Sequence, residues 1–307
     1  MAVKECFDFL SVKGCPLQAR RWIPDGNIRG IVQIVHGMAE HIDRYDRAAC
    51  ALNEAGFLVT GHNHLGHGKS ASLHGFFGDR NGWQALIDDV HSLRTLTEKA
   101  FAGAPYFLLG HSMGSFVVRC YLTEHAEDLS GAIISGTGYY QPSVVRAGLI
   151  LSNLMCFLGY AKKESPFIDR IAFSSSNKPF APSRTPFDWL TRDEGEVDKY
   201  VSDPECGFIF TASGYRDLFR GLMRLTRTEE LNKIPSSLPV LFISGEKDPI
   251  GAMGSGVQKV SEEFANAKLK NITVQLYPGC RHELFNELNR QEVFGDLINW
   301  LEKQLIT

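Results

Sequence analysis

Short apolar runs alternate with helical patterns along much of the chain, and this alternation most constrains the fold. The apolar runs occupy residues 31–35, 57–60, 106–110, 131–135, 239–244 and 271–277. Helical spacing of apolar residues follows most of these runs, most clearly at residues 83–101. Strands that alternate with helices are typical of βαβ units. We therefore expect an α/β fold with a mostly parallel central sheet, preceded by strands at residues 6–12 and 17–23.

The alternation stops between residues 138 and 225. This stretch contains apolar helical patterns and loops rich in Ser, Pro and Phe, without a clear strand pattern. The strand pattern resumes at residue 239. An interruption of this size is within the range of a small domain. The sequence thus predicts an α/β core formed by residues 1–137 and 226–307, with residues 138–225 inserted as a helical cap.

Composition narrows the functional classes. The chain has 307 residues, of which 44% are hydrophobic and 22% charged, which is ordinary for a globular protein. Its formal net charge of −3 leaves no domain-wide basic surface for nucleic acid. We expect a small-molecule substrate and no nucleic-acid partner.

Two features predict a cytoplasmic protein. The seven cysteines are odd in number, widely spaced and without a C-x-x-C pair, which favours a reducing compartment. The N-terminal residues lack the apolar region of a secretory signal. The most apolar stretch, 144–161, is interrupted by Arg146, Ser152 and Asn153, and its apolar runs are shorter than the ~20 residues that span a bilayer. We expect no transmembrane segment.

The segment Gly110-His-Ser112-Met-Gly114 carries the chemistry. It is a G-x-S-x-G motif directly after the apolar strand 106–110 and directly before a helical pattern. In that context the chain turns sharply, and the serine side chain projects above the carboxyl end of the sheet. The helix that follows favours negative charge at its N-terminus. Ser112 is therefore the predicted nucleophile.

A serine nucleophile needs a base, and the base needs an acid that orients it. In folds of this kind the chain order is Ser, then Asp or Glu, then His. Only His125 and His282 follow Ser112, and His125 lies about three helical turns away along the same helix. This elimination predicts His282 as the base.

Asp248 is the predicted acid. It lies in the turn that follows the strand 239–244. Pro249 holds the residue before it, Asp248, in an extended conformation. Most other candidate carboxylates lie in the cap. Glu246, in the same turn, is the nearest rival. The loop after the strand 31–35 supplies one backbone N–H, that of Met38, to an oxyanion hole. The second donor is the amide of Met113, the residue after the nucleophile.

Five segments together resemble the α/β-hydrolase superfamily, and within it the monoacylglycerol lipase and lysophospholipase-like group. They are HGMAEHIDRY, NHLGHGKS, GHSMG, GEKDPI and GCRHELFNE. The resemblance covers most of the chain, although Asn63 stands where the group usually has Asp. It implies an α/β-hydrolase fold with a cap after the sixth strand. It also implies that Glu40 and Arg44 form polar contacts behind the catalytic residues; a surface ion pair is the alternative.

These observations predict a serine hydrolase that cleaves carboxylic esters through an acyl-serine intermediate, most consistent with a lipase or lysophospholipase acting on single-chain acyl esters. No cofactor or metal is expected. Transient contact of the cap with a membrane surface is a further expectation.

Leu154 belongs to a helical pattern that is apolar over much of its circumference. Such a helix buries two faces or leaves one exposed. We expect one face to pack on the core and the other, with Leu154, to line an acyl pocket above Ser112. The alternative is that both faces are core of the cap.

Other functional classes remain open at this stage. His62, His64 and His67 have the H-x-H-x-x-H spacing of a metal-dependent hydrolase, although Gly66 stands where such sites usually have Asp. A peptidase or an acyltransferase of the same fold would also keep the serine. A non-catalytic small-molecule binder is the remaining alternative, against which the complete set of three residues argues.

Overall fold

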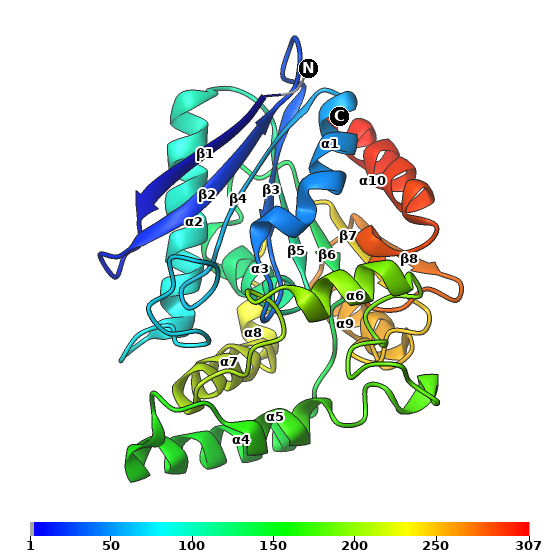
Figure 1. Cartoon of the computed structure of the whole chain (residues 1–307). Helices are drawn as coiled ribbons and strands as arrows, with labels where there is room; N and C mark the ends of the chain where they lie inside the picture. The colour runs from blue at the N-terminus through cyan, green and yellow to red at the C-terminus, as the bar shows by residue number, and fades with distance from the viewer. Residues whose placement is uncertain (1–2, 307) are drawn as a thin grey trace.

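A single eight-stranded sheet organises the computed structural model, which describes residues 3–306. The strand order is β1-β2-β4-β3-β5-β6-β7-β8 (Figure 1). The strands are β1 (Val3–Leu10), β2 (Pro16–Ile23), β3 (Gly30–Val35), β4 (Phe57–His62), β5 (Tyr106–His111), β6 (Gly131–Ser135), β7 (Val240–Gly245) and β8 (Ile272–Tyr277). β1 and β2 pair antiparallel, β2 pairs antiparallel with β4, and all later neighbours pair parallel. The predicted α/β fold class is confirmed.

Helices cover both faces of the sheet. One face packs on α2 (Gly82–Ala100), α3 (Met113–His125) and α9 (Ser255–Asn266), and the other on α1 (Asp46–Glu54) and α10 (Arg290–Leu305). Successive strand residues alternate between the two faces: in β3, Ile31 packs in the first layer and Val32 in the second. The central strands β3 to β7 are buried along their whole length, so they consist of nearly continuous apolar runs.

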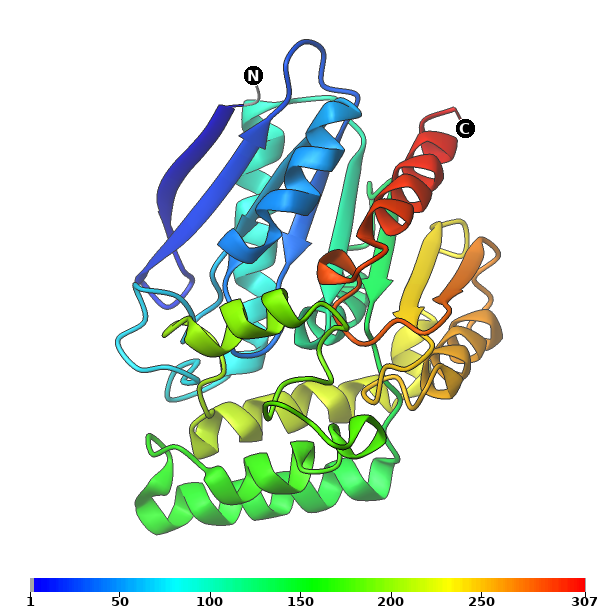
Figure 2. The same cartoon turned by 45° about the vertical axis from the view of Figure 1, so that its right-hand side comes forward.

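The chain between β6 and β7 forms helices that cover the carboxyl ends of the parallel strands (Figure 2). They are α4 (Pro142–Met155), η2 (Cys156–Tyr160), α5 (Pro166–Phe173), η3 (Lys178–Phe180), α6 (Glu194–Ser202), α7 (Ala212–Leu225) and α8 (Thr228–Leu231). This segment lies after the sixth strand. We use "cap" for residues 138–225, whose two boundaries stay a prediction.

α4 packs by one face only. Val145 and Ser152 are buried, and Gly148 lies so close to the Phe219 ring of α7 that a Cβ there would be 2.4 Å from it. The opposite face is exposed and apolar. By length and composition alone, the 19-residue helix Pro142–Tyr160 could cross a membrane, and 11% of its apolar window is buried. The prediction of no transmembrane segment rested on the short apolar runs within 144–161, whereas the helix formed there is 19 residues long.

Candidate active site

Ser112 lies at the sharp turn between β5 and α3. Its φ of 52° and ψ of −120° are rare for a residue with a side chain. A Cβ on Gly110 would lie 2.5 Å from the Gly114 carbonyl oxygen, and one on Gly114 would lie 2.0 Å from the Val35 carbonyl oxygen. Both glycines are therefore required by close backbone approach. The Ser112 side chain remains partly exposed, as an attacking group must be.

His282 and Asp248 form a buried pair. His282 Nδ1 lies 2.9 Å from Asp248 Oδ2, and the two residues are 2% and 0% exposed. Asp248 is held in direction because its Oδ1 accepts from the Ile250 amide at 2.8 Å and its Oδ2 accepts from Ser244 Oγ at 3.2 Å. Burial on its own lowers the pKa of His282, but the Asp248 carboxylate opposes it, and the resulting pKa is above the ordinary value.

The rival acid, Glu246, does not meet the histidine. Its carboxylate is exposed and accepts a hydrogen bond from the Gly279 amide at 3.4 Å. Both carboxyls belong to the turn after β7, so sequence position alone could not separate them. The structure brings Asp248, and not Glu246, to His282.

The turn after β6 joins the nucleophile to the base. Ser135 accepts a hydrogen bond from the Ser112 amide at 2.9 Å, and a Cβ on the next residue, Gly136, would lie 3.1 Å from His282 Cε1. A Cβ on Gly37 would lie 3.1 Å from Ser112 Cβ. The carboxyl ends of the neighbouring parallel strands therefore bring together the three predicted catalytic residues and the loop after β3.

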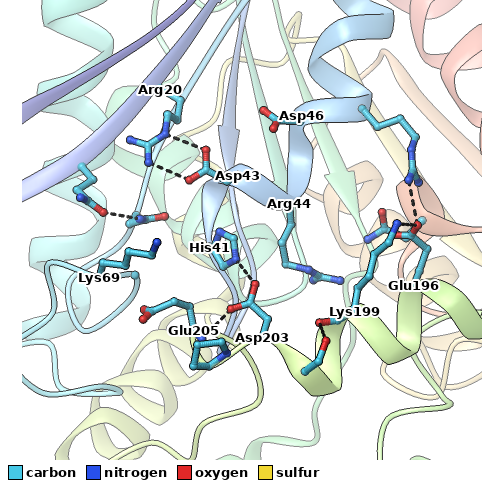
Figure 3. Close-up of a pocket in the computed structure, with 17 residues that line it drawn as sticks. Arg20, His41, Asp43, Arg44, Asp46, Lys69, Glu196, Lys199, Asp203 and Glu205 are labelled. Carbon is cyan, nitrogen blue, oxygen red and sulfur yellow. Dashed lines mark hydrogen bonds and ion pairs between the residues drawn. The ribbon is translucent and has the colours of Figure 1, made fainter.

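Glu40 and Arg44 are buried between that loop and the His282 loop. Glu40 accepts from the Gly37 amide at 2.6 Å and from Arg44 Nη1 at 2.6 Å. Arg44 belongs to η1 (Ile42–Tyr45), and Figure 3 shows its place beside the neighbouring pocket. Its guanidinium forms two 2.7 Å bonds to Glu283. Their burial excludes the alternative of a surface ion pair. Burial on its own raises the pKa of Glu283, but Arg44 outweighs it and holds that pKa well below the ordinary value.

The loop that contains Met38 is fixed on both sides. The Ala39 amide donates to His67 Nε2 at 3.2 Å, and the Gly37 amide donates to Glu40. Ala39 has a φ of 52°, and its carbonyl accepts from Tyr200 Oη and from the Gly207 amide, both at 3.0 Å. Within residues 3–306 no acceptor is recorded for the Met38 amide between them. An anchored loop with a free central amide suits an oxyanion donor.

In the histidine-rich loop after β4, His64 and His67 form hydrogen bonds with backbone groups. His67 Nδ1 lies 3.0 Å from the Leu65 carbonyl, while its Nε2 accepts from Ala39, and His64 Nε2 lies 3.2 Å from the His36 carbonyl. Burial lowers the pKa of His64 to about 4 and that of His67 to about 3, so both are neutral at physiological pH. The His64 and His67 imidazoles bond backbone groups, whereas the buried His62 ring has no hydrogen-bond partner among the described residues. This arrangement favours the reading that His64 and His67 support the loop after β3. Asn63 contributes in the same way, because its Oδ1 accepts from the Ile42 amide at 2.8 Å.

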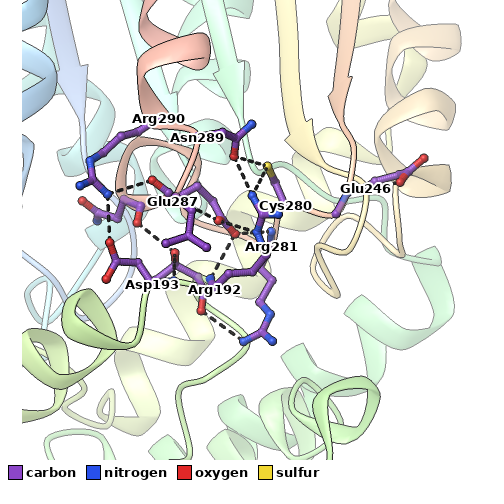
Figure 4. Close-up of polar contacts among 12 residues, drawn as sticks. Arg192, Asp193, Glu246, Cys280, Arg281, Glu287, Asn289 and Arg290 are labelled. Carbon is purple, nitrogen blue, oxygen red and sulfur yellow. Dashed lines mark hydrogen bonds and ion pairs between the residues drawn. The ribbon is translucent and has the colours of Figure 1, made fainter.

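A second set of contacts, which the sequence analysis missed, ties the cap to the His282 loop (Figure 4). Arg192 of the cap pairs with the buried Glu287 at 2.8 Å, and Glu287 also accepts from the Arg281 amide at 2.8 Å. Arg290 pairs with Asp193 at 3.0 Å. Arg192 and Glu287 are 95 positions apart in the chain, and Asp193 and Arg290 are 97 apart, so no local pattern could pair them.

Leu154 lies away from this site. It is 52% exposed and occupies the face of α4 opposite the buried Ser152. The prediction that it lines an acyl pocket is corrected accordingly: the face of α4 that packs does so on α7, and Leu154 belongs to the outer surface. Apolar side chains do lie beside His282, but they come from another part of the cap. The Trp189 ring is 5.0 Å from the His282 ring and stacks on Phe173.

The fold is that of an α/β-hydrolase, with Ser112 at the turn after β5, a buried Asp248–His282 pair and helices inserted between β6 and β7. A family model described as serine aminopeptidase, S33, matches residues 26–289, and the chain belongs to that family. A monoacylglycerol lipase of Mycolicibacterium smegmatis is 26% identical over 300 residues, covering 97% of this chain and 96% of the relative. The human monoglyceride lipase is 26% identical over 302 residues, covering 97% and 90%.

A solved carboxyl esterase of Bacillus coagulans, in complex with glycerol, superposes with a TM-score of 0.92 at 30% identity, covering 99% of this chain and 100% of that chain. The resemblance to the monoacylglycerol lipase group is confirmed by these relatives.

Proposed function

We propose that the protein is a serine hydrolase that cleaves carboxylic esters with a single acyl chain. The observation that carries this proposal is the buried Asp248–His282 pair beside the strained turn at Ser112. Monoacylglycerol lipases and an esterase among the relatives support the ester as the bond attacked. The geometry of the site and the names of these relatives therefore both support ester hydrolysis.

Each step of the proposed reaction has a residue that can perform it. Asp248 accepts from His282 Nδ1–H, which leaves Nε2 to take the proton of Ser112 as Oγ attacks the ester carbonyl. The amides of Met38 and Met113 stabilise the oxyanion as charge develops. His282 returns the proton to the leaving alcohol, and an acyl-serine remains. Water, deprotonated by His282, then releases the carboxylic acid.

The surroundings of His282 favour an apolar acyl group. Trp189 and Phe173 of the cap and Ile250 of the loop after β7 belong to one apolar cluster. Burial of each methylene contributes ~0.8 kcal/mol, which corresponds to up to about fourfold in kcat/KM. A chain bound along this cluster would thus be distinguished from acetate by affinity alone.

We further propose that the outer face of the cap contacts the lipid surface where such esters reside. The exposed apolar residues of α4, η2 and α5 form this outer face: Val144, Ile150, Leu154, Phe157, Leu158, Phe167 and Ile171. A helix with one apolar face in the interface and the other on protein lies on a membrane and does not span it. The packing of α4 on α7 supports a helix that lies on the membrane surface.

The seven cysteines, all free, support a reducing compartment, and we propose the cytoplasm as the location.

A substrate panel tests the reaction. We expect kcat/KM for p-nitrophenyl esters to rise from C2 toward longer chains until the site is filled, and monoacylglycerols to be hydrolysed. An aminoacyl-nitroanilide is the comparison substrate, because the family description includes aminopeptidases. Turnover of the anilide above every ester would contradict the proposal and favour the peptidase. A preference for acetate would remove the long-chain substrate while leaving the esterase.

A further inference from the structure

Three side chains that could ligate a metal meet where the cap contacts the core, outside the proposed catalytic residues. They are His41, which precedes η1, and Asp203 and Cys206, which follow α6. One ligand atom from each lies within 4.8 Å of the other two. His41 Nε2 is 2.9 Å from Asp203 Oδ2, so these two are already in contact (Figure 3).

The chemistry of the three donors is selective. An imidazole nitrogen, a carboxylate oxygen and a thiolate sulfur are the ligands of Zn²⁺ and related borderline-soft divalent ions. Hard cations such as Mg²⁺ and Ca²⁺ prefer oxygen alone. Three protein ligands leave a fourth position for water.

A cavity beside these residues supplies access and water. It has a volume of about 860 Å³, and His41 and Asp203 line it together with other polar side chains such as Lys69 and Glu205 (Figure 3). The Asp203 carboxylate is held in direction, because its Oδ1 accepts from the Glu205 amide at 2.8 Å. A ligand group that is already oriented loses little freedom when an ion binds.

The positive charge of Arg44, the nearest buried cation, is offset by neighbouring carboxylates, so its repulsion of a metal ion is reduced. Arg44 lines the same cavity, but Glu40 and Glu283 both pair with it at 2.6–2.7 Å. These three groups carry a net charge of −1.

We infer that His41, Asp203 and Cys206 form a binding site for a divalent zinc-like ion that joins the cap to the core. Binding would form bonds from His41 Nε2, Asp203 and Cys206 Sγ to the ion. The proton on His41 Nε2 would move to Nδ1 by tautomerisation, and the thiol proton would be released to solvent. The site is continuous with the loop after β3. Gly207, the next residue after Cys206, donates to the Ala39 carbonyl at 3.0 Å. An ion there would reinforce the contact that holds this loop against the cap.

A second group of the described residues provides a matched control. Asp88, Glu124 and His125 also bring one ligand atom each within 4.8 Å, but all three belong to α2 and α3 of the core and none of them offers a thiol. Ion binding there would neither give a thiolate signal nor join cap and core.

Titration of the metal-free full-length protein with Co²⁺ and with Zn²⁺ tests the inference. We expect about one equivalent of Co²⁺ to give thiolate-to-metal charge-transfer absorption, and Zn²⁺ to displace it and raise Tm. Cys206→Ser should abolish the absorption and weaken Zn²⁺ binding at least tenfold, and His41→Gln should weaken binding similarly. Cys156→Ser and His125→Gln are controls and should keep both effects.

Each variant's fold is checked by circular dichroism and by turnover of a soluble ester. Absorption that persists in Cys206→Ser, or a Tm rise lost only in His125→Gln, would overturn the site. So would the absence of any cobalt signal or zinc-induced Tm change in the wild-type protein.

Discussion

The carboxyl end of the sheet and the outer face of α4 are both made largely by side chains that sequence patterns single out, yet these side chains differ in how completely other residues contact them. Asp248 is 0% and His282 2% exposed, and each has a defined contact. Phe157 is 87% and Leu154 52% exposed on the outer face of the cap. A side chain with fixed protein contacts has the same role whichever substrate binds. An exposed apolar face has a role only when another surface, such as a membrane, binds to it.

The largest expected effect lies at the partnered end. Asp248→Asn should lower kcat by ~10⁴, because His282 loses the carboxylate that sets its tautomer and stabilises its charged form. Glu246→Gln, in the same turn but exposed, is the matched control and should retain activity. Steady-state kinetics on a soluble ester compares them. An equal loss of kcat in both variants, or a loss of kcat in Glu246→Gln alone, would contradict the assignment of Asp248 as the acid.

Next in size is the buried ion pair behind the site. Arg44→Met leaves Glu40 and Glu283 buried without their cation, and such a loss costs about 3–5 kcal/mol of unfolding free energy. Arg47→Met, which removes a more exposed pair with Glu196, should cost about 1 kcal/mol or less. Urea unfolding measures both. Similar costs for the two variants would mean that burial does not separate these pairs.

A smaller effect concerns pH. The neutral form of His282 acts as the base, and Asp248 raises its pKa above the ordinary value near 6.5 despite burial. We therefore expect kcat/KM on a soluble ester to fall as pH decreases through a midpoint above 6.5. In Asp248→Asn the midpoint of the residual activity should move to lower pH. A midpoint that is unchanged in this variant would show that another group titrates.

The smallest effect should occur on the unpartnered face. Leu154→Asp places a charge on the outer face of the cap, so turnover of an ester in lipid vesicles should fall several-fold while turnover of a dissolved short ester is unchanged. Leu96→Asp, at an exposed leucine of α2, is the control and should affect neither. Vesicle flotation of the same variants measures binding directly. Equal flotation of Leu154→Asp and wild type would exclude this face as the membrane contact.

The same contrast explains what could be predicted from the sequence. The core strands and helices were predicted to within a few residues, as in 83–101 for α2 at Gly82–Ala100, because both faces of the sheet are buried and the apolar pattern is strong. The G-x-S-x-G context and the chain order led to Ser112, Asp248 and His282 without knowledge of their distances.

What the sequence could not supply were partners distant in the chain. Glu283 stands next to His282 in the motif GCRHELFNE, but its pairing with Arg44 joins positions 239 apart. The outer position of Leu154 was missed because an apolar helix has the same pattern whether its second face covers a pocket or faces solvent. Trp189 lies in a loop without periodicity, so nothing in the sequence indicated its contact with His282.

The most direct test of the account is covalent labelling of the nucleophile. A fluorophosphonate should modify the wild-type protein once, at Ser112, as identified by mass spectrometry of the digested protein. Ser112→Ala should fold normally, take up no label and lose several orders of magnitude in ester turnover. Ser255→Ala, which removes an exposed serine from the start of α9, should label and react as the wild type does. Full ester turnover by purified, folded Ser112→Ala, or labelling at another serine with loss of activity, would contradict the assignment of Ser112.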